Sequence, residues 1–121
     1  MQGNMWVVDI YLGTLAANAN GVVPIPFACQ LVGAALVGTN ASDATLDCGT
    51  VADGDGIFDG VAAGDSSAAA YYTHANFNGA LATAGQPYPF AAQAELAWSI
   101  DYDGSSGTAI QKSHLQFVFT Q

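Results

Sequence analysis

With 121 residues, of which 51% are hydrophobic and 14 are glycine, the chain is long enough for one globular domain with a sizeable core. The chain has ten acidic residues and one basic residue, Lys112, which gives a formal net charge of −9. This charge excludes the basic surface that binding to nucleic acids or anionic membranes requires. No stretch has the ~18 apolar residues of a membrane-spanning helix, and no window has a sustained helical period. We therefore expect an all-β protein that binds neither nucleic acid nor membrane.

The N-terminal part of the chain predicts a short arm followed by strands. Residues 1–5 are polar and short, so we expect an N-terminal arm outside a single domain of residues 6–121. A first strand is expected at residues 5–15, because large apolar residues occupy every second position there. Residues 22–27 carry two prolines and predict an edge or entry segment, whereas the apolar residues 29–37 predict a further strand.

The middle of the chain predicts three short strands and one long loop. Residues 44–51, 57–62 and 68–73 are apolar segments bounded by turns rich in Asp, Gly and Ser. Residues 74–90 form the longest irregular connection. Long loops on a β scaffold are where contacts with partners concentrate, so this connection is expected to face a partner.

Two alternating runs near the C-terminus predict an antiparallel hairpin at the centre of the domain. Their large apolar residues are Leu96, Trp98, Ile100 and Tyr102 in the first run and Leu115, Phe117 and Phe119 in the second. A Gly- and Ser-rich cluster at residues 103–107 separates the runs and is typical of a turn. Because Ile110 is out of phase with the second run, we expect a bulge or irregular turn near residues 111–113.

In total the sequence predicts seven or eight strands at short, regular spacing. This number and spacing favour an antiparallel sandwich of two sheets, jelly-roll-like in type. The order of the strands stays open, because a jelly roll and other Greek-key sandwiches share the same local patterns.

The acidic residues are too scattered to predict a metal site. Asp53, Asp55 and Asp59 lie close together in the sequence, which suggests calcium, a cation that prefers several oxygen ligands. However, Ile57 and Gly64 stand at the two positions where an EF-hand loop counted from Asp53 needs oxygen side chains. We interpret these acids as solvated turn residues.

The cysteine and histidine patterns predict neither zinc nor redox chemistry. Cys29 and Cys48 lie in apolar segments and are interpreted as buried small hydrophobic residues, with a disulfide between them left open. His74 falls in a loop and His114 on the outer face of a strand, and no pair has the spacing of zinc ligands. The nucleophile-elbow and phosphate-loop motifs are missing too. We expect no enzymatic activity and no cofactor.

Contacts with other subunits are expected at the N-terminal arm and at tyrosines near loops. The residues proposed for these contacts are Gln2, Asn4, Met5, Tyr71, Tyr72 and Tyr88. A polar arm can add a strand to the exposed sheet edge of a neighbour. Aromatic side chains anchor protein interfaces, and we favour this role for the tyrosines over stacking on a sugar.

Four segments of the chain carry a resemblance to a known family. They are Val23-Pro24-Ile25-Pro26-Phe27-Ala28-Cys29, Ala44-Thr45-Leu46-Asp47, Gly64-Asp65-Ser66-Ser67 and Glu95-Leu96-Ala97-Trp98-Ser99-Ile100-Asp101-Tyr102-Asp103-Gly104. With this layout, the chain from Trp6 to Gln121 resembles the small head decoration, or cement, proteins of tailed bacteriophages. Similar proteins often have Ala-Gly-Asp before the penultimate strand, where this chain has Ala92-Gln93-Ala94.

The resemblance implies a non-enzymatic β-sandwich that binds the exterior of an assembled virion capsid. Its partner would be the major capsid protein, and the chain would form a homotrimer at local threefold positions. Two other hypotheses stay open. One is a carbohydrate-binding jelly-roll module of a phage tail or fibre, with Tyr71, Tyr72 or Tyr88 as a stacking platform. The other is a hydrolase or a binding domain that depends on a divalent metal held by the loop of residues 53–59.

Overall fold

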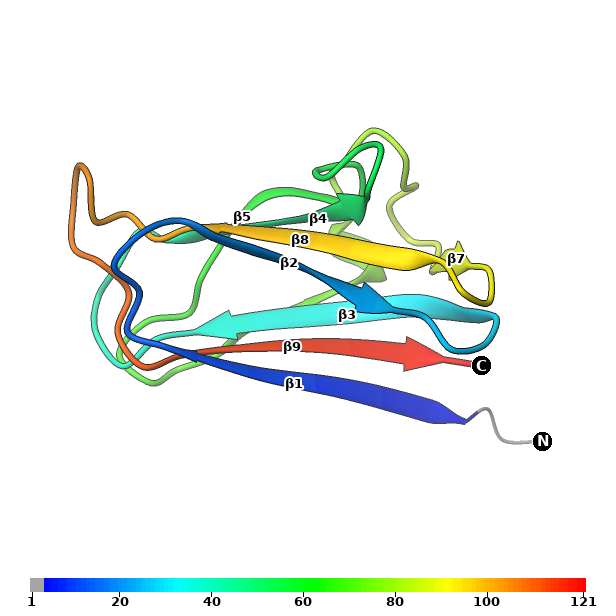
Figure 1. The fold of residues 1–121 in the computed structure, drawn as a ribbon, viewed down its shortest axis with the longest axis horizontal. Coiled ribbons are helices and arrows are strands. Elements are labelled where there is room, and N and C mark those ends of the chain that lie inside the picture. The colour runs from blue at the N-terminus through cyan, green and yellow to red at the C-terminus, as the bar shows by residue number, and fades with distance from the viewer. Residues whose placement is uncertain (1–3) are drawn as a thin grey trace.

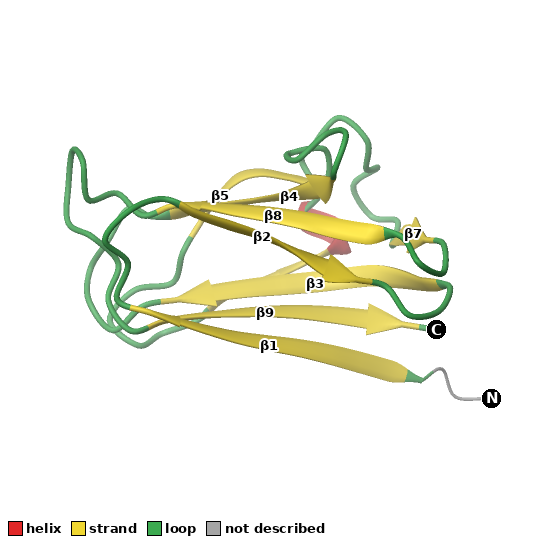
Figure 2. Cartoon of the chain, viewed as in Figure 1, coloured by secondary structure: helices red, strands yellow, loops and turns green. Residues whose placement is uncertain are grey.

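A computed structural model describes residues 4–121 as an antiparallel β-sandwich (Figures 1 and 2). Its elements are β1 (Met5–Gly13), β2 (Ala19–Pro24), β3 (Cys29–Val37), β4 (Thr45–Thr50), β5 (Phe58–Ala62), β6 (Ala70–Thr73), the 3₁₀ turn η1 (His74–Asn76), β7 (Tyr88–Phe90), β8 (Glu95–Asp101) and β9 (Ser113–Thr120). The predicted all-β class and two-sheet architecture are confirmed. No helix in the described part of the chain has the length and apolar character needed to cross a membrane.

The strand order is that of a jelly roll with one extra short strand. The five-stranded sheet has the order β1-β9-β3-β6, and β7 pairs with the same edge of β3 as β6 does. The four-stranded sheet has the order β2-β8-β4-β5. The chain crosses repeatedly between the two sheets, as in Greek-key sandwiches, and Figure 1 shows the two layers lying one above the other.

The core lies between the two sheets and follows from the alternation in the sequence. Inward residues of β8 and β9 are fully or almost fully buried, as are those of β3 and β4; they include Leu31, Leu36, Leu46, Leu96, Trp98, Ile100, Leu115, Phe117 and Phe119. Tyr102 is half-buried against this cluster. Each large apolar side chain buried in this way contributes roughly 1.5–3 kcal/mol before entropy is counted, so this cluster dominates the stability of the fold.

The predicted hairpin between the last two strands is wrong. β8 pairs with β2 and β4, whereas β9 pairs with β1 and β3 in the other sheet. The intervening chain, residues 102–112, leaves the edge of one sheet and enters the other instead of closing a tight turn. Its length explains the error, because two-residue turns favour hairpins and a longer connection leaves the pairing undetermined.

The irregularity predicted before β9 is present. Lys112 has a φ of +48°, and the β1–β9 register shifts between Tyr11 and Gly13, opposite this point. The Ser113 hydroxyl donates to the Gly13 carbonyl at 2.7 Å, so this carbonyl has a hydrogen-bond partner at the point where the β1–β9 ladder is interrupted. Ile110 is fully buried although it belongs to no strand, which accounts for its phase in the sequence.

Several boundaries differ from the sequence-based expectations: β1 ends at Gly13 instead of residue 15, and β2 begins at Ala19 instead of residue 22. Met5, placed in the arm, is the first residue of β1, and the Asn4 carbonyl accepts from the Gln121 amide at 2.9 Å. The rest of the arm, including Gln2, lies outside the described residues. β2 ends at Pro24 as an edge strand, in line with the expected edge segment. The long connection contains η1 and the three-residue β7, so residues 4–121 form nine strands where seven or eight were expected.

Candidate functional site

Three of the four sheet edges carry features that prevent pairing with another chain. β2 ends in Pro24, and β6 and β7 are only four and three residues long, with Pro89 in β7. β5 contains Gly60 at a φ of +69° and pairs with β4 through a register shift. Prolines, irregularities and short length are the usual means by which sheet edges are protected from association.

The edge formed by β1 has such an irregularity only at its end, where Gly13 has a φ of +72° and the register with β9 shifts; from Met5 to Tyr11 its pairing with β9 is unbroken. It is nine residues long, contains no proline, and no strand among residues 4–121 pairs with its outer side. Along its length it carries one charge, Asp9. A long, nearly neutral edge strand of this kind is a template on which an added strand can form hydrogen bonds.

The direction of the β1 backbone groups follows from its pairing with β9. Asn4 and Gln121 stand opposite each other, and the bond between them identifies a hydrogen-bonded pair. Such pairs alternate along an antiparallel ladder, so Trp6, Val8 and Ile10 also bond to β9. The N–H and C=O groups of the intervening residues, Met5, Val7, Asp9 and Tyr11, therefore point away from β9 toward the open side.

The inward side chains of β1 are covered only in part. Trp6, Val8, Ile10 and Leu12 pack against the core but stay half-buried. Trp6 stacks on Phe119, with ring centroids 4.7 Å apart. A strand added beside β1 would remove more of this apolar surface from water and would be stabilised accordingly.

The outer face of the five-stranded sheet is mostly neutral and carries exposed apolar groups. Its largest exposed side chains are Met5, Val7, Tyr11 and Tyr71, with 67%, 46%, 66% and 69% of their surface accessible. On the same face, Asp9 Oδ1 accepts from Gln116 Nε2 at 2.9 Å and lies 3.5 Å from His114 Nε2. These groups border a depression of about 170 Å³, whose lining also includes Ala35, Val37, Ala69 and Tyr71.

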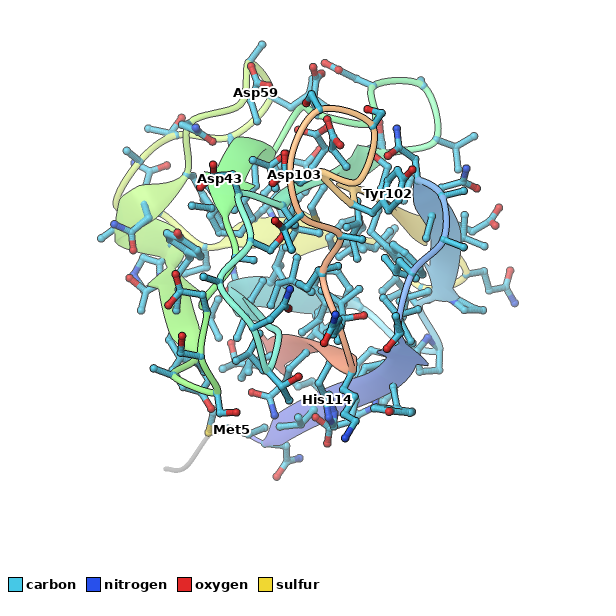
Figure 3. The ribbon with its side chains drawn as sticks, turned by 90° about the vertical axis from the view of Figure 1, so that its left-hand side faces the viewer. Met5, Asp43, Asp59, Tyr102, Asp103 and His114 are labelled. Atoms are coloured by element: carbon cyan, nitrogen blue, oxygen red, sulfur yellow. The ribbon has the colours of Figure 1, made fainter. Side chains whose placement is uncertain are left out.

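The outer face of the four-stranded sheet differs sharply in charge. Its strands carry Asp47, Asp59, Glu95 and Asp101, whereas the strands of the five-stranded sheet carry Asp9 alone. In Figure 3, which looks along the strands, Asp59, Asp43 and Asp103 lie in the upper half and His114 and Met5 lie below, beside β1. The chain thus presents an acidic side and a nearly neutral side.

Crowding of carboxylates on the acidic side changes their titration. Burial raises the pKa of Asp47, and the nearby charges of Asp59 and Asp55 raise it further. The Gly60 amide donates to Asp47 Oδ1 at 2.6 Å and acts in the opposite direction. The pKa of Asp53 is raised chiefly by a side-chain hydrogen bond with Asp55. Like charges therefore accumulate on this side of the molecule.

Comparison with known proteins adds no relative. No family model, curated protein or solved structure matches this chain. Its function is therefore inferred from its own geometry.

The tyrosines predicted as contact residues have different environments. Tyr71 projects from the outer face of the five-stranded sheet and is free to contact a partner. Tyr72 points toward the core, and its hydroxyl donates to the Ala62 carbonyl at 2.6 Å. Tyr88 is half-buried and packs edge-to-face on Phe90 at 5.1 Å. Of these three tyrosines, only Tyr71 has a ring that is exposed for contact with a partner.

Three further residues, which were not predicted from the sequence as contact residues, lie on the same face. Tyr11, Asp9 and Gln116 join Tyr71 there because β9 and β3 lie between β1 and β6. Their outward position could be read from the alternation, but their proximity could not, since it depends on the strand order.

The side chains that could bind a metal ion do not form a cluster in the described part of the chain. Among residues 4–121, no group of three His, Cys, Asp or Glu side chains is placed to hold a metal ion. Cys29 and Cys48 are free and buried, as the prediction of small hydrophobic residues required. Burial raises the pKa of both thiols, which keeps them protonated and unreactive.

Proposed function

We propose that this chain is a capsid decoration protein that binds the outer surface of a phage head and stabilises it. It would bind the major capsid protein, with three copies of the chain associating around local threefold positions. The observation that carries this proposal is the contrast between one open sheet edge, β1, and three protected edges. A domain whose only function was to fold and stay monomeric would have its longest edge protected as well.

The open edge offers a specific way of attachment. An extended segment of a shell subunit would pair with the outward amides and carbonyls of β1 and continue the five-stranded sheet. This pairing would also cover Trp6 and Val8, which are half-buried in the isolated chain. Because such a segment is in position only in the assembled shell, binding stabilises the assembled form by mass action.

The charge distribution supports the same orientation. The acidic four-stranded sheet would face the medium, where repulsion between particles favours solubility. The nearly neutral β1 edge would face the shell, where unpaired charge would be costly to bury. Many copies on one particle supply avidity, so each individual contact can be modest.

The test uses empty heads of the parent virus assembled without this chain. Wild-type chain is expected to bind their exterior, with cryo-electron microscopy density for β1 continuous with a strand of the shell. Val7→Pro removes an outward amide of β1 and should abolish binding. Val22→Pro is the matched control, because Val22 has nearly the same exposure, 49% against 46%, and lies on the protected β2 edge.

Two results would refute the proposal. One is the absence of wild-type chain from the head exterior under conditions in which both proteins are folded. The other is equal head binding by Val7→Pro and Val22→Pro, which would show that the β1 edge plays no part in attachment.

A further inference from the structure

We infer that the outer face of the five-stranded sheet carries a binding site for a neutral saccharide, with Tyr71 as its stacking platform and Asp9 and Gln116 as hydrogen-bonding groups. This inference goes beyond the proposed attachment to a shell and does not depend on it. A chain held by its β1 edge leaves this face of the sheet open.

The first observation is an exposed tyrosine, Tyr71, beside a floor of small residues, with a second exposed tyrosine, Tyr11, on the same face of the sheet. Tyr71 lies on β6 and Tyr11 on β1, separated by β9 and β3, roughly 14 Å at the usual strand spacing. Ala35 and Val37 on β3 line the depression beside Tyr71. A flat, accessible ring beside a shallow floor suits the apolar face of a sugar ring, which is itself flat.

The second observation is the polar cluster at the same depression. Asp9 Oδ1 is occupied by Gln116 Nε2, which leaves Asp9 Oδ2 and Gln116 Oε1 without a side-chain partner in the described structure. His114 lies beside Asp9 and packs edge-to-face against Tyr11 at 6.2 Å. Two acceptors held in fixed positions beside an aromatic platform are complementary to adjacent hydroxyl groups.

Charge and size restrict the class of ligand. The formal net charge of −9 and the Asp9 carboxylate disfavour phosphates, sulfates and acidic sugars. A single carboxylate that is shared with Gln116 and His114 is a poor site for a metal cation. The depression, about 170 Å³, is smaller than the roughly 300–1,000 Å³ of pockets for drug-sized molecules. These limits favour one or a few rings of an uncharged oligosaccharide.

The test is a printed array of neutral and acidic oligosaccharides, followed by titration calorimetry with the neutral oligosaccharide that binds best. Tyr71→Ala and Asp9→Asn should each weaken binding tenfold or more, because each removes one of the two kinds of contact. Gln116→Ala should weaken it less. Val22→Ala, on the opposite sheet, is the control and should bind as wild type. Because the ligand is uncharged, affinity should stay constant between about 50 and 500 mM salt.

Each alternative result overturns the inference. No binding of any neutral oligosaccharide at millimolar concentration would eliminate the site. Unchanged binding by Tyr71→Ala, with its melting temperature equal to wild type, would place the sugar elsewhere. If Tyr71→Ala and Asp9→Asn instead lose binding to empty heads, this face is a shell contact. Failure of the saccharide test with normal head binding leaves the proposed function intact.

Discussion

The two sheets of this protein have similar inner faces and different outer faces. Both pack fully buried aliphatic and aromatic residues against the shared core, such as Phe117 in β9 and Leu96 in β8. Outside, one sheet is acidic with protected edges, and the other is nearly neutral with the open edge of β1. Folding therefore constrains the inner faces alike, whereas the outer faces are free to serve separate purposes.

The largest expected effect tests the equivalence of the inner faces. Phe117→Ala in the five-stranded sheet and Leu96→Ala in the four-stranded sheet each remove a fully buried side chain. We expect both to lower the free energy of unfolding by about 3–5 kcal/mol, measured by urea denaturation. The outward Gln116→Ala, adjacent to Phe117, should stay within about 0.5 kcal/mol of wild type. A much smaller loss for one sheet would mean that the core is not shared equally.

The sequence predicted which side of each strand faces the core, but not which strands are neighbours. Alternation of large apolar residues correctly indicated the buried sides of β8 and β9. The same alternation holds whatever the partner, so it was compatible with a hairpin that the fold does not contain. Pairing of β9 with β1, more than one hundred residues away in the sequence at Met5↔Thr120, depends on long-range packing.

The candidate sites were harder to predict than the fold for the same reason. The exposed position of Tyr71 could be expected near a loop, but its proximity to Asp9 requires β9 and β3 to lie between their strands. Tyr72 illustrates the opposite error: it is adjacent in sequence to Tyr71, yet strand geometry turns it toward the core. Because adjacent side chains of a strand point to opposite faces of a sheet, the sequence alone would have placed Tyr71 and Tyr72 on different faces.

A second prediction tests the assignment of backbone groups along the open edge. Val8→Pro removes an amide that bonds to β9, whereas Val7→Pro removes one that points outward. Val8→Pro should therefore lower the free energy of unfolding by about 2 kcal/mol more than Val7→Pro does. Chemical denaturation of the two variants measures this difference. Equal losses would mean that the alternation is assigned wrongly, and the β1 edge would then expose different groups from those proposed to bind a shell.

The smallest expected effect concerns the acidic sheet, where Asp47→Asn should stabilise the protein. Burial and the charges of Asp59 and Asp55 raise the pKa of the Asp47 carboxyl, so the folded state holds its proton more tightly than the unfolded chain does. Stability therefore falls as pH rises from the ordinary aspartate pKa through the raised one, and the loss is complete at neutral pH.

Asn at position 47 keeps an oxygen acceptor for the Gly60 amide but carries no charge. After allowance for solvent screening, we expect a gain of about 0.5 kcal/mol at pH 7, or about 2 °C in melting temperature. The gain should disappear below about pH 3, where Asp47 is protonated in both the folded and the unfolded state. Glu95→Gln removes one charge from an exposed position of the same sheet and should change the melting temperature less. A lower melting temperature for Asp47→Asn at pH 7 would show that the charged hydrogen bond to Gly60 outweighs burial and repulsion, and the acidic face would then stabilise the fold.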